Sequence, residues 1–188
     1  MKYAGIIYDD TAAAPGLSLS FYTQGCPIRC PGCHNQDMWD FEGGFEFTDE
    51  VRDRIISKLN ENGILRNLCI LGGEPLCEQN AKMVMMLCCA ARAIYPDIKI
   101  YLWTGYTLEE LCEREQNDYA IRNMLECIDV LIANPFDISK RDVTLELRGS
   151  SNQEIYKFVT EDEYINGGKH FGFEREGTDY PYIIKNEN

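Results

Sequence analysis

Three cysteines crowd into one short segment near the amino terminus. Cys26, Cys30 and Cys33 have a C-x3-C-x2-C spacing within GCPIRCPGCHNQ, among glycines and prolines that allow sharp turns. A structural zinc site needs four ligands in a tetrahedron, and His34 directly follows Cys33, which makes it awkward for the same ion. Three thiolates on one loop suit three corners of a 4Fe–4S cube and leave one iron free for a non-protein ligand. The spacing favours a cluster, with zinc or simple buried thiols as alternatives.

The chain around these cysteines alternates between strand and helix patterns. Short runs rich in Leu, Ile and Val predict strands, and apolar residues three or four apart after a capping Thr predict helices. The expected strands cover residues 17–23, 66–73, 98–105, 129–134 and 154–160, and the expected helices cover 48–63, 80–94 and 107–127, the last with a break near Asn117. This alternation favours a parallel sheet covered by helices.

Four segments of unusual composition directly follow these strands. They are the cysteine loop, residues 72–75 (GGEP), residues 103–106 (WTGY) and residues 133–136 (ANPF). The carboxyl ends of parallel strands lie at the same edge of a sheet, and ligands of α/β proteins bind there. We therefore expect all four segments to meet at one rim.

The cysteine triplet resembles the signature of radical S-adenosylmethionine (SAM) enzymes, and longer motifs narrow the resemblance. These motifs are APGLSLSFYTQGCPIRCPGCHNQDMW, LGGEPL, LWTGYTLEEL and LRGSSNQ. Their order and approximate spacing are typical of the activating proteins of anaerobic ribonucleoside-triphosphate reductase. The chain is similar to this family of glycyl-radical-enzyme activases from about residue 14 to residue 153.

The resemblance implies a fold, two cofactors and two partners. The implied fold is α/β, a partial (β/α) barrel of the radical SAM type with a mostly parallel sheet and helices outside. The cofactors are a 4Fe–4S cluster, bound by Cys26, Cys30 and Cys33, and SAM, whose reductive cleavage gives methionine and a 5′-deoxyadenosyl radical. The partners are the glycyl-radical subunit of anaerobic ribonucleoside-triphosphate reductase and an electron donor of the flavodoxin or ferredoxin type.

Residues at the ends of the second and third strands are the expected SAM contacts. Gly72 and Gly73 lack side chains, so the backbone can approach a ligand closely and bind the SAM ammonium group, and Glu74 adds a carboxylate. An ordinary strand-to-helix turn with a capping glutamate is the alternative. Thr104 and Gly105 are expected to line the same pocket.

Three further residues are expected to contact SAM. His34, directly after Cys33, is expected to stack on the adenine, with a hydrogen-bonded loop histidine or a metal ligand as the alternatives. Arg148 and Asn152, in RGSSNQ, offer donors suited to the SAM carboxylate, the ribose or a partner peptide. A polar turn before a strand is the alternative for this motif.

Composition limits the class of protein. At 188 residues the chain is short for two independent domains, so we expect one domain, 1–188, with a carboxyl-terminal extension of unknown role over about 160–188. The chain has 18 Lys and Arg against 31 Asp and Glu, without a basic cluster for nucleic acid. No signal sequence or membrane-spanning apolar run is evident. Nine cysteines fit a reducing compartment. We expect a cytoplasmic protein that binds neither nucleic acid nor membrane.

The six cysteines outside the triplet are expected to be small buried hydrophobic residues, and Cys77 is the one near the expected rim. Other interpretations of the function remain open. A zinc-stabilised interaction module and an electron-transfer iron–sulfur protein are alternatives from other classes, although the latter normally closes its cluster with a fourth cysteine. Within the enzyme class, the alternative is an activase of a different glycyl-radical enzyme.

Overall fold

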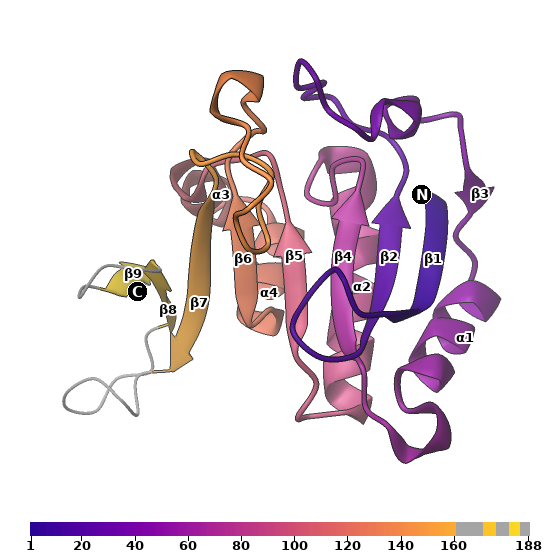
Figure 1. Ribbon diagram of the computed structural model, residues 1–188. Coiled ribbons are helices and arrows are strands. Elements are labelled where there is room, and N and C mark those ends of the chain that lie inside the picture. Colours follow the sequence, from indigo (N-terminus) through magenta and orange to yellow (C-terminus); the bar gives the residue numbers. More distant parts are fainter. Residues whose placement is uncertain (161–170, 176–180, 185–188) are drawn as a thin grey trace.

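One sheet forms the frame of the molecule in a computed structural model that describes residues 1–160, 171–175 and 181–184 (Figure 1). The strands are β1 (Lys2–Asp10), β2 (Ser18–Thr23), β3 (Phe45–Glu46), β4 (Asn67–Gly72), β5 (Ile100–Trp103), β6 (Val130–Ala133), β7 (Glu154–Thr160), β8 (Phe171–Arg175) and β9 (Pro181–Ile184). The helices are α1 (Asp49–Leu59), α2 (Glu78–Ile94), α3 (Leu108–Glu115) and α4 (Tyr119–Cys127). The order of the strands is β3-β1-β2-β4-β5-β6-β7-β8-β9.

The sheet is mixed and open, which corrects the expected fold. Strands β2, β4, β5 and β6 are parallel. Every other pairing among the described strands is antiparallel. The described sheet ends at β3 on one side and β9 on the other and does not close on itself. The prediction of a partial (β/α) barrel with a mostly parallel sheet is therefore wrong, although the class is α/β.

The connections explain where the prediction failed. Helical crossovers join β2 to β4, β4 to β5 and β5 to β6, and such crossovers return the chain to a parallel strand. By contrast, β1 and β2 are joined by a short loop, and β6 and β7 by a longer loop with one 3-10 turn, so both pairs run antiparallel. The sequence pattern did not reveal β1 as a strand.

Side-chain caps start three of the helices, α1, α3 and α4. The Thr48 hydroxyl accepts a hydrogen bond from the Val51 N–H and starts α1. Thr107 and Glu110 form a capping box on α3. Asp118 caps α4, which confirms the predicted break near Asn117. Of the helices in the described part of the chain, none has the length and apolar character needed to cross a membrane.

The helices pack on one face of the sheet, behind the strands in the view of Figure 1. A row of paired residues across five strands carries this core: Phe21, Ile70, Leu102, Leu131 and Tyr156. Four of them are fully buried and Tyr156 is nearly so. The alternate residues point to the other face, where Tyr22, Leu71 and Trp103 are only half-buried. This second face, called the open face below, is flanked by the loops at 11–17 and 134–153.

Candidate functional site

The cysteine loop, residues 24–44, leaves the carboxyl end of β2 and folds back on itself. The Gly25 N–H donates to the Met38 carbonyl at 2.9 Å, and the Cys26 N–H donates to the Trp39 carbonyl at 3.2 Å. A turn brings the Cys33 N–H to the Cys30 carbonyl at 3.1 Å. Cys26 is buried, whereas Cys30 and Cys33 are half-buried. The three thiols therefore sit on a loop whose ends are joined by backbone hydrogen bonds.

The four strand-end segments meet at one cavity, as the parallel strands predicted. This first cavity has a volume of about 120 Å³ and lies at the carboxyl ends of β2, β4, β5 and β6. Its lining includes Cys26, Cys30, Cys33, Gly72, Gly73, Glu74, Thr104, Gly105 and Asn134. Trp39 and Phe136 also line it, which makes part of its wall apolar.

The three thiols are placed together, as the predicted cluster requires. All three line the same cavity. In a 4Fe–4S cube each thiolate binds a different iron, so three thiolates fill three corners and one iron remains without a protein ligand. The donor set thus fits the predicted cluster.

Two of the thiols, Cys26 and Cys30, have a pKa above that of free cysteine. Burial raises the pKa of Cys26, although the N–H groups of Arg29 and Ile28 oppose the effect. Burial also raises the pKa of Cys30, and the Phe136 N–H opposes it. Metal ligation requires thiolates, so loading this loop must release protons. Iron binding should therefore strengthen as the pH rises.

Glu74 is a buried carboxylate that ties two strand-end segments together. It is 1% exposed. One of its oxygens accepts from the Thr104 hydroxyl at 2.7 Å and from the Leu76 N–H at 2.9 Å, and the other accepts from the Gly105 N–H at 2.8 Å. Burial raises the pKa of Glu74, against the opposing effect of these hydrogen bonds. The carboxylate thus holds residues 104–105 against residues 74–76.

The glycines at 72 and 73 contact the chain itself closely. A Cβ on Gly73 would lie 2.2 Å from the Gly25 carbonyl oxygen. A Cβ on Gly72 would lie 2.5 Å from the Thr23 carbonyl oxygen, and the φ of Gly72 is +105°. The absence of side chains is therefore required for packing against the start of the cysteine loop. Both glycines also line the first cavity, so their contact with a ligand stays a prediction.

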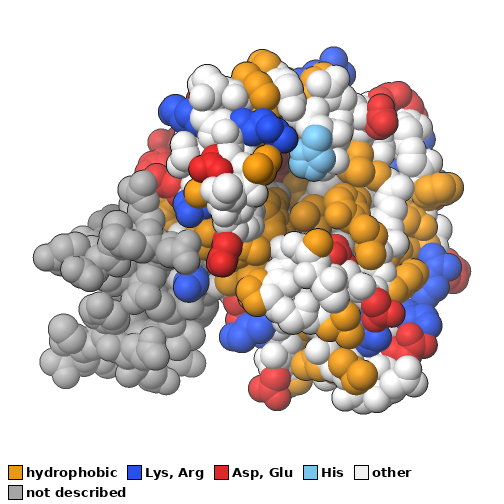
Figure 2. All heavy atoms as spheres, viewed as in Figure 1, with side chains coloured by type: hydrophobic (Ala, Val, Ile, Leu, Met, Phe, Trp, Pro, Cys, Tyr) orange, Lys and Arg blue, Asp and Glu red, His pale blue; other side chains and the backbone are white. Residues whose placement is uncertain are grey.

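A second, larger cavity adjoins the first on the open face. Its volume is about 410 Å³, and both cavities share Cys33, Gly72, Trp103, Phe136 and Gln153. Figure 2 shows hydrophobic side chains gathered around a hollow in this face. The remaining lining includes His34, which is exposed, and Arg148, which is half-buried. These two residues, far apart in sequence, thus face one space beside the cysteines.

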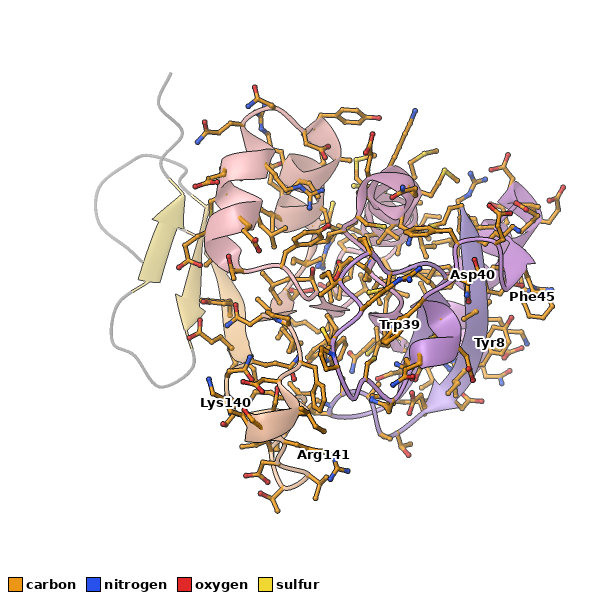
Figure 3. All side chains as sticks on the ribbon, turned by 90° about the horizontal axis from the view of Figure 1, so that it is seen from above. Tyr8, Trp39, Asp40, Phe45, Lys140 and Arg141 are labelled. Atoms are coloured by element: carbon orange, nitrogen blue, oxygen red, sulfur yellow. The ribbon has the colours of Figure 1, made fainter. Side chains whose placement is uncertain are left out.

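Arg148 and its neighbours in the 134–153 loop differ in what they face. The Arg148 Nε is buried without a hydrogen-bond partner among the described residues, while one Nη donates to the Gln153 carbonyl at 3.3 Å. In Figure 3, Lys140 and Arg141 project at the margin of the molecule, away from Trp39. Neither lines the two cavities. Of the cations in this loop, Arg148 is therefore the one that lines a cavity, and its contact with a ligand stays a prediction.

Asn152 lies beside the site but lines neither cavity. Its Nδ2 donates to the Pro135 carbonyl at 2.8 Å, and its carbonyl accepts from the Asn134 Nδ2 at 2.9 Å. Asn134 has a φ of +81° and lines the first cavity. The observed contacts of Asn152 thus shape the turn at residues 134–135.

Two site residues escaped the sequence analysis. Asn80, in the first turn of α2, is 1% exposed, and its Nδ2 donates to the carbonyls of Gln24 and Glu74, both at 3.0 Å. It therefore joins the start of the cysteine loop to the GGEP turn. Gln153 lines both cavities. Only the position of Asn80 just after GGEP, and of Gln153 at the end of RGSSNQ, could have drawn attention to them.

Comparison with known proteins points to an iron–sulfur family. Residues 12–156 match the model of the family described as 4Fe-4S single cluster domain. That span includes the cysteine loop and all four strand-end segments.

Curated relatives share most of their length with the chain. A protein of Vibrio cholerae named anaerobic ribonucleoside-triphosphate reductase-activating protein is 37% identical over 160 residues, covering 85% of this chain and 99% of the relative. The protein of the same name from Escherichia coli (strain K12) is 35% identical over 157 residues, covering 83% and 98%. The one from Enterobacteria phage T4 is 32% identical over 157 residues, covering 83% and 94%.

Proposed function

The chain belongs to the family of anaerobic ribonucleoside-triphosphate reductase-activating proteins, and from this premise we propose that it is a radical SAM activase. In this proposal, it cleaves SAM reductively and generates a glycyl radical on anaerobic ribonucleoside-triphosphate reductase. The observation that carries the proposal is the placement of Cys26, Cys30 and Cys33 on one cavity, directly beside a larger cavity on the open face.

Cys26, Cys30 and Cys33 would hold the cluster as thiolates in the first cavity. When bound and reduced, the cluster would supply the electron for cleavage of a carbon–sulfur bond of SAM, which would give methionine and a 5′-deoxyadenosyl radical. The apolar side chains of Trp39 and Phe136 keep water away from this point. The chain itself would thus provide the cysteine ligands of the cluster and an apolar wall that limits the access of water.

The second cavity is the proposed SAM site. Arg148 lines this cavity, and its guanidinium can pair with the SAM carboxylate. His34 lies on the same cavity and can stack on the adenine. Glu74 lines the adjoining first cavity and already accepts three hydrogen bonds, but a carboxylate has about four lone-pair sites, so one remains for the SAM ammonium group. Asn152 would act through the turn at residues 134–135.

A polypeptide substrate suits the open face. Tyr22, Leu71 and Trp103 are half-buried there, and all three line the second cavity. A glycine offers no side chain to obstruct its α-hydrogen, and the product radical is stabilised by the flanking amide groups. A flavodoxin or ferredoxin-type protein would supply the electron. All nine cysteines are free, which agrees with the reducing cytoplasm as the place of action.

Anaerobic reconstitution followed by turnover tests the proposal. The protein should bind about four irons. With a strong reductant, it should convert SAM to 5′-deoxyadenosine and methionine. Addition of the anaerobic reductase from the same organism should then give a glycyl radical, detected as a doublet by electron paramagnetic resonance. Cys30→Ala should abolish all three results.

Cys112→Ala is the matched control, because Cys112 is also half-buried but lies on α3, outside both cavities. It should retain iron and turnover. One bound zinc and no iron would overturn the cluster assignment. A loaded cluster that never yields deoxyadenosine, with or without the reductase, would leave an electron carrier. Activation of another glycyl-radical enzyme in place of the reductase would show that the substrate assignment is wrong.

A further inference from the structure

Two cysteines outside the site lie next to each other on the helix-covered side of the sheet. Cys89 lies on α2, and Cys127 is the last residue of α4. Their Sγ atoms are 2.8 Å apart. A disulfide bond is about 2.05 Å long, so less than about 1 Å of movement separates the two thiols from bonding distance.

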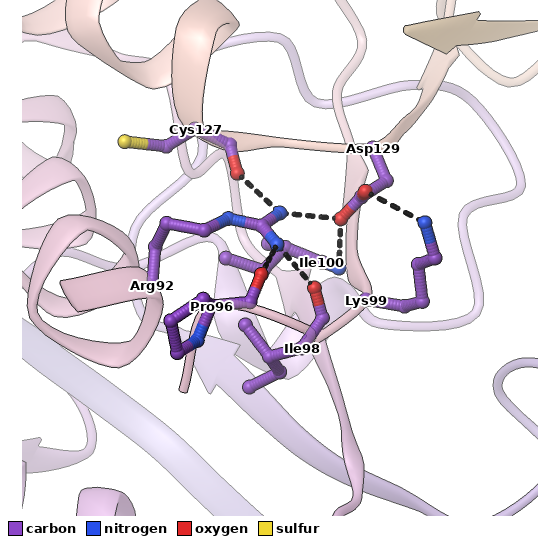
Figure 4. A network of polar contacts seen from close by, with 7 residues as sticks. All are labelled: Arg92, Pro96, Ile98, Lys99, Ile100, Cys127 and Asp129. Atoms are coloured by element: carbon purple, nitrogen blue, oxygen red, sulfur yellow. Dashed lines mark hydrogen bonds and ion pairs between the residues drawn. The ribbon is translucent and has the colours of Figure 1, made fainter. Parts of the chain in front are cut away.

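The backbone around Cys127 is fixed by a polar network that does not use the sulfur atoms (Figure 4). One Nη of Arg92, on α2, donates to the Cys127 carbonyl at 3.0 Å and to the Asp129 carboxylate at 2.6 Å. The same carboxylate accepts from the Ile100 N–H at 2.8 Å, and Lys99 donates to its other oxygen at 3.1 Å. The end of α4 is thereby held against α2 whatever the state of the thiols.

Cys89 and Cys127 are half-buried, whereas their neighbour Cys88 is fully buried. Burial and the adjacent Cys89 raise the pKa of Cys127 to about 12, so Cys127 is a thiol at neutral pH. The thiolate is the nucleophile in disulfide exchange. Attack by one sulfur therefore requires its deprotonation, and the other sulfur lies 2.8 Å away to complete the reaction.

We propose that Cys89 and Cys127 are an oxidative modification site, which a small disulfide such as oxidised glutathione converts to an intramolecular disulfide. One of the two cysteines, as a thiolate, attacks the small disulfide, forms a mixed disulfide and releases one thiolate. The sulfur of the other cysteine then attacks the mixed disulfide, loses its proton and releases the second small thiol. Two protein thiols are oxidised, one external disulfide is reduced to two thiols, and a dithiol reductant reverses the change.

The bond would link two segments separated by 38 positions. The enclosed chain contains β5, α3 and α4, together with Thr104 and Gly105 of the first cavity. A cross-link restricts the unfolded chain more than the folded one. Oxidation should therefore stabilise this part of the molecule against heat. This inference does not depend on the proposed SAM chemistry.

Peptide mapping of the full-length protein tests the inference. The protein, purified anaerobically with its iron, is treated with oxidised glutathione, alkylated and digested with trypsin. Fragment 83–92, which contains Cys88 and Cys89, should be found linked to fragment 123–140, which contains Cys127. The link should persist in Cys88→Ala and Cys112→Ala and vanish in Cys89→Ala and Cys127→Ala. The melting temperature of the wild type should rise by about 5–10 °C and return after reduction.

Several results would overturn the inference. Separate glutathione adducts on Cys89 and Cys127 would show that the thiols do not bond to each other. A link through Cys88, or a mixture of pairings, would show that the geometry does not select this pair. If Cys127→Ala did not fold, mapping of the wild type with fragment sequencing would still decide which sulfur atoms are joined.

Discussion

The helix-covered face of the sheet and the cavity rim are built from the same strands but are held in different ways. On the helix-covered face, Phe21 and Leu102 are fully buried among other apolar side chains. At the rim, backbone groups touch directly at Gly73, and Glu74 and Asn80 supply the cross-links. The stability of the helix-covered face depends on the apolar area that is buried, while the geometry of the rim depends on a few close contacts and hydrogen bonds. One added atom should therefore damage the rim more than it damages the core.

The largest effect is expected from one methyl group at the rim. In Gly73→Ala, the new Cβ would lie 2.2 Å from the Gly25 carbonyl oxygen, so the start of the cysteine loop must move. The variant should keep its helical circular dichroism but bind little iron after anaerobic reconstitution. Gly5→Ala is the matched control, because nothing lies within 4 Å of a Cβ built there. Full iron binding by Gly73→Ala would contradict the close packing at the rim.

A substitution in the core should lower the stability of the fold, rather than acting first on iron binding. Phe21 is 0% exposed and packs against the rings of Tyr3 and Phe47. Phe21→Ala should lower the free energy of unfolding by about 3–5 kcal/mol, measured by urea denaturation. Tyr22→Ala, one position along on the open face, should lower it by only about 1 kcal/mol, because Tyr22 is half-buried. Equal losses in the two variants would remove the distinction between the faces.

The smallest effect concerns Asp10, which shapes the loop at 11–17. Its carboxylate accepts from the Ser20 hydroxyl at 2.6 Å and from the Ala12 N–H at 2.8 Å. Burial acts to raise the pKa of Asp10, but these hydrogen bonds and one from the Ala13 N–H outweigh it and lower the pKa. Asp10→Asn should lower the free energy of unfolding by about 1 kcal/mol at neutral pH.

The sign of the pH dependence follows from that lowered pKa. The stabilisation is present above the ordinary value of 3.8 and disappears as the pH falls through the folded-state pKa. Urea denaturation of both proteins between neutral pH and about pH 3 should therefore show the difference shrinking in acid. A difference that stayed constant with pH would mean that the Asp10 charge plays no part.

Much of the fold could be predicted from the chain because the signals are local. Capping by Thr48, Thr107 and Asp118 depends on neighbours three residues away or fewer. The strands β2, β4, β5 and β6 alternate with helices, which is enough to place their carboxyl ends on one rim. The three-cysteine spacing within one loop likewise predicted a 4Fe–4S cluster, and the chain matches a family described as 4Fe-4S single cluster domain; the assignment of these cysteines as its ligands stays a prediction.

The remaining features arise from contacts between distant segments. The pairing of β1 with β2, and of β7 with β6, made the sheet mixed and open, and no local pattern specifies a strand's partner. In the same way, the spacing could not show that Gly73 packs on Gly25, nor that Asn80 reaches Gln24. Sequence by itself determined which residues can carry the chemistry, because that depends on residue type and local spacing. Only the tertiary structure decided how those residues are held and that Cys89 meets Cys127, because those contacts join residues that are remote in the chain.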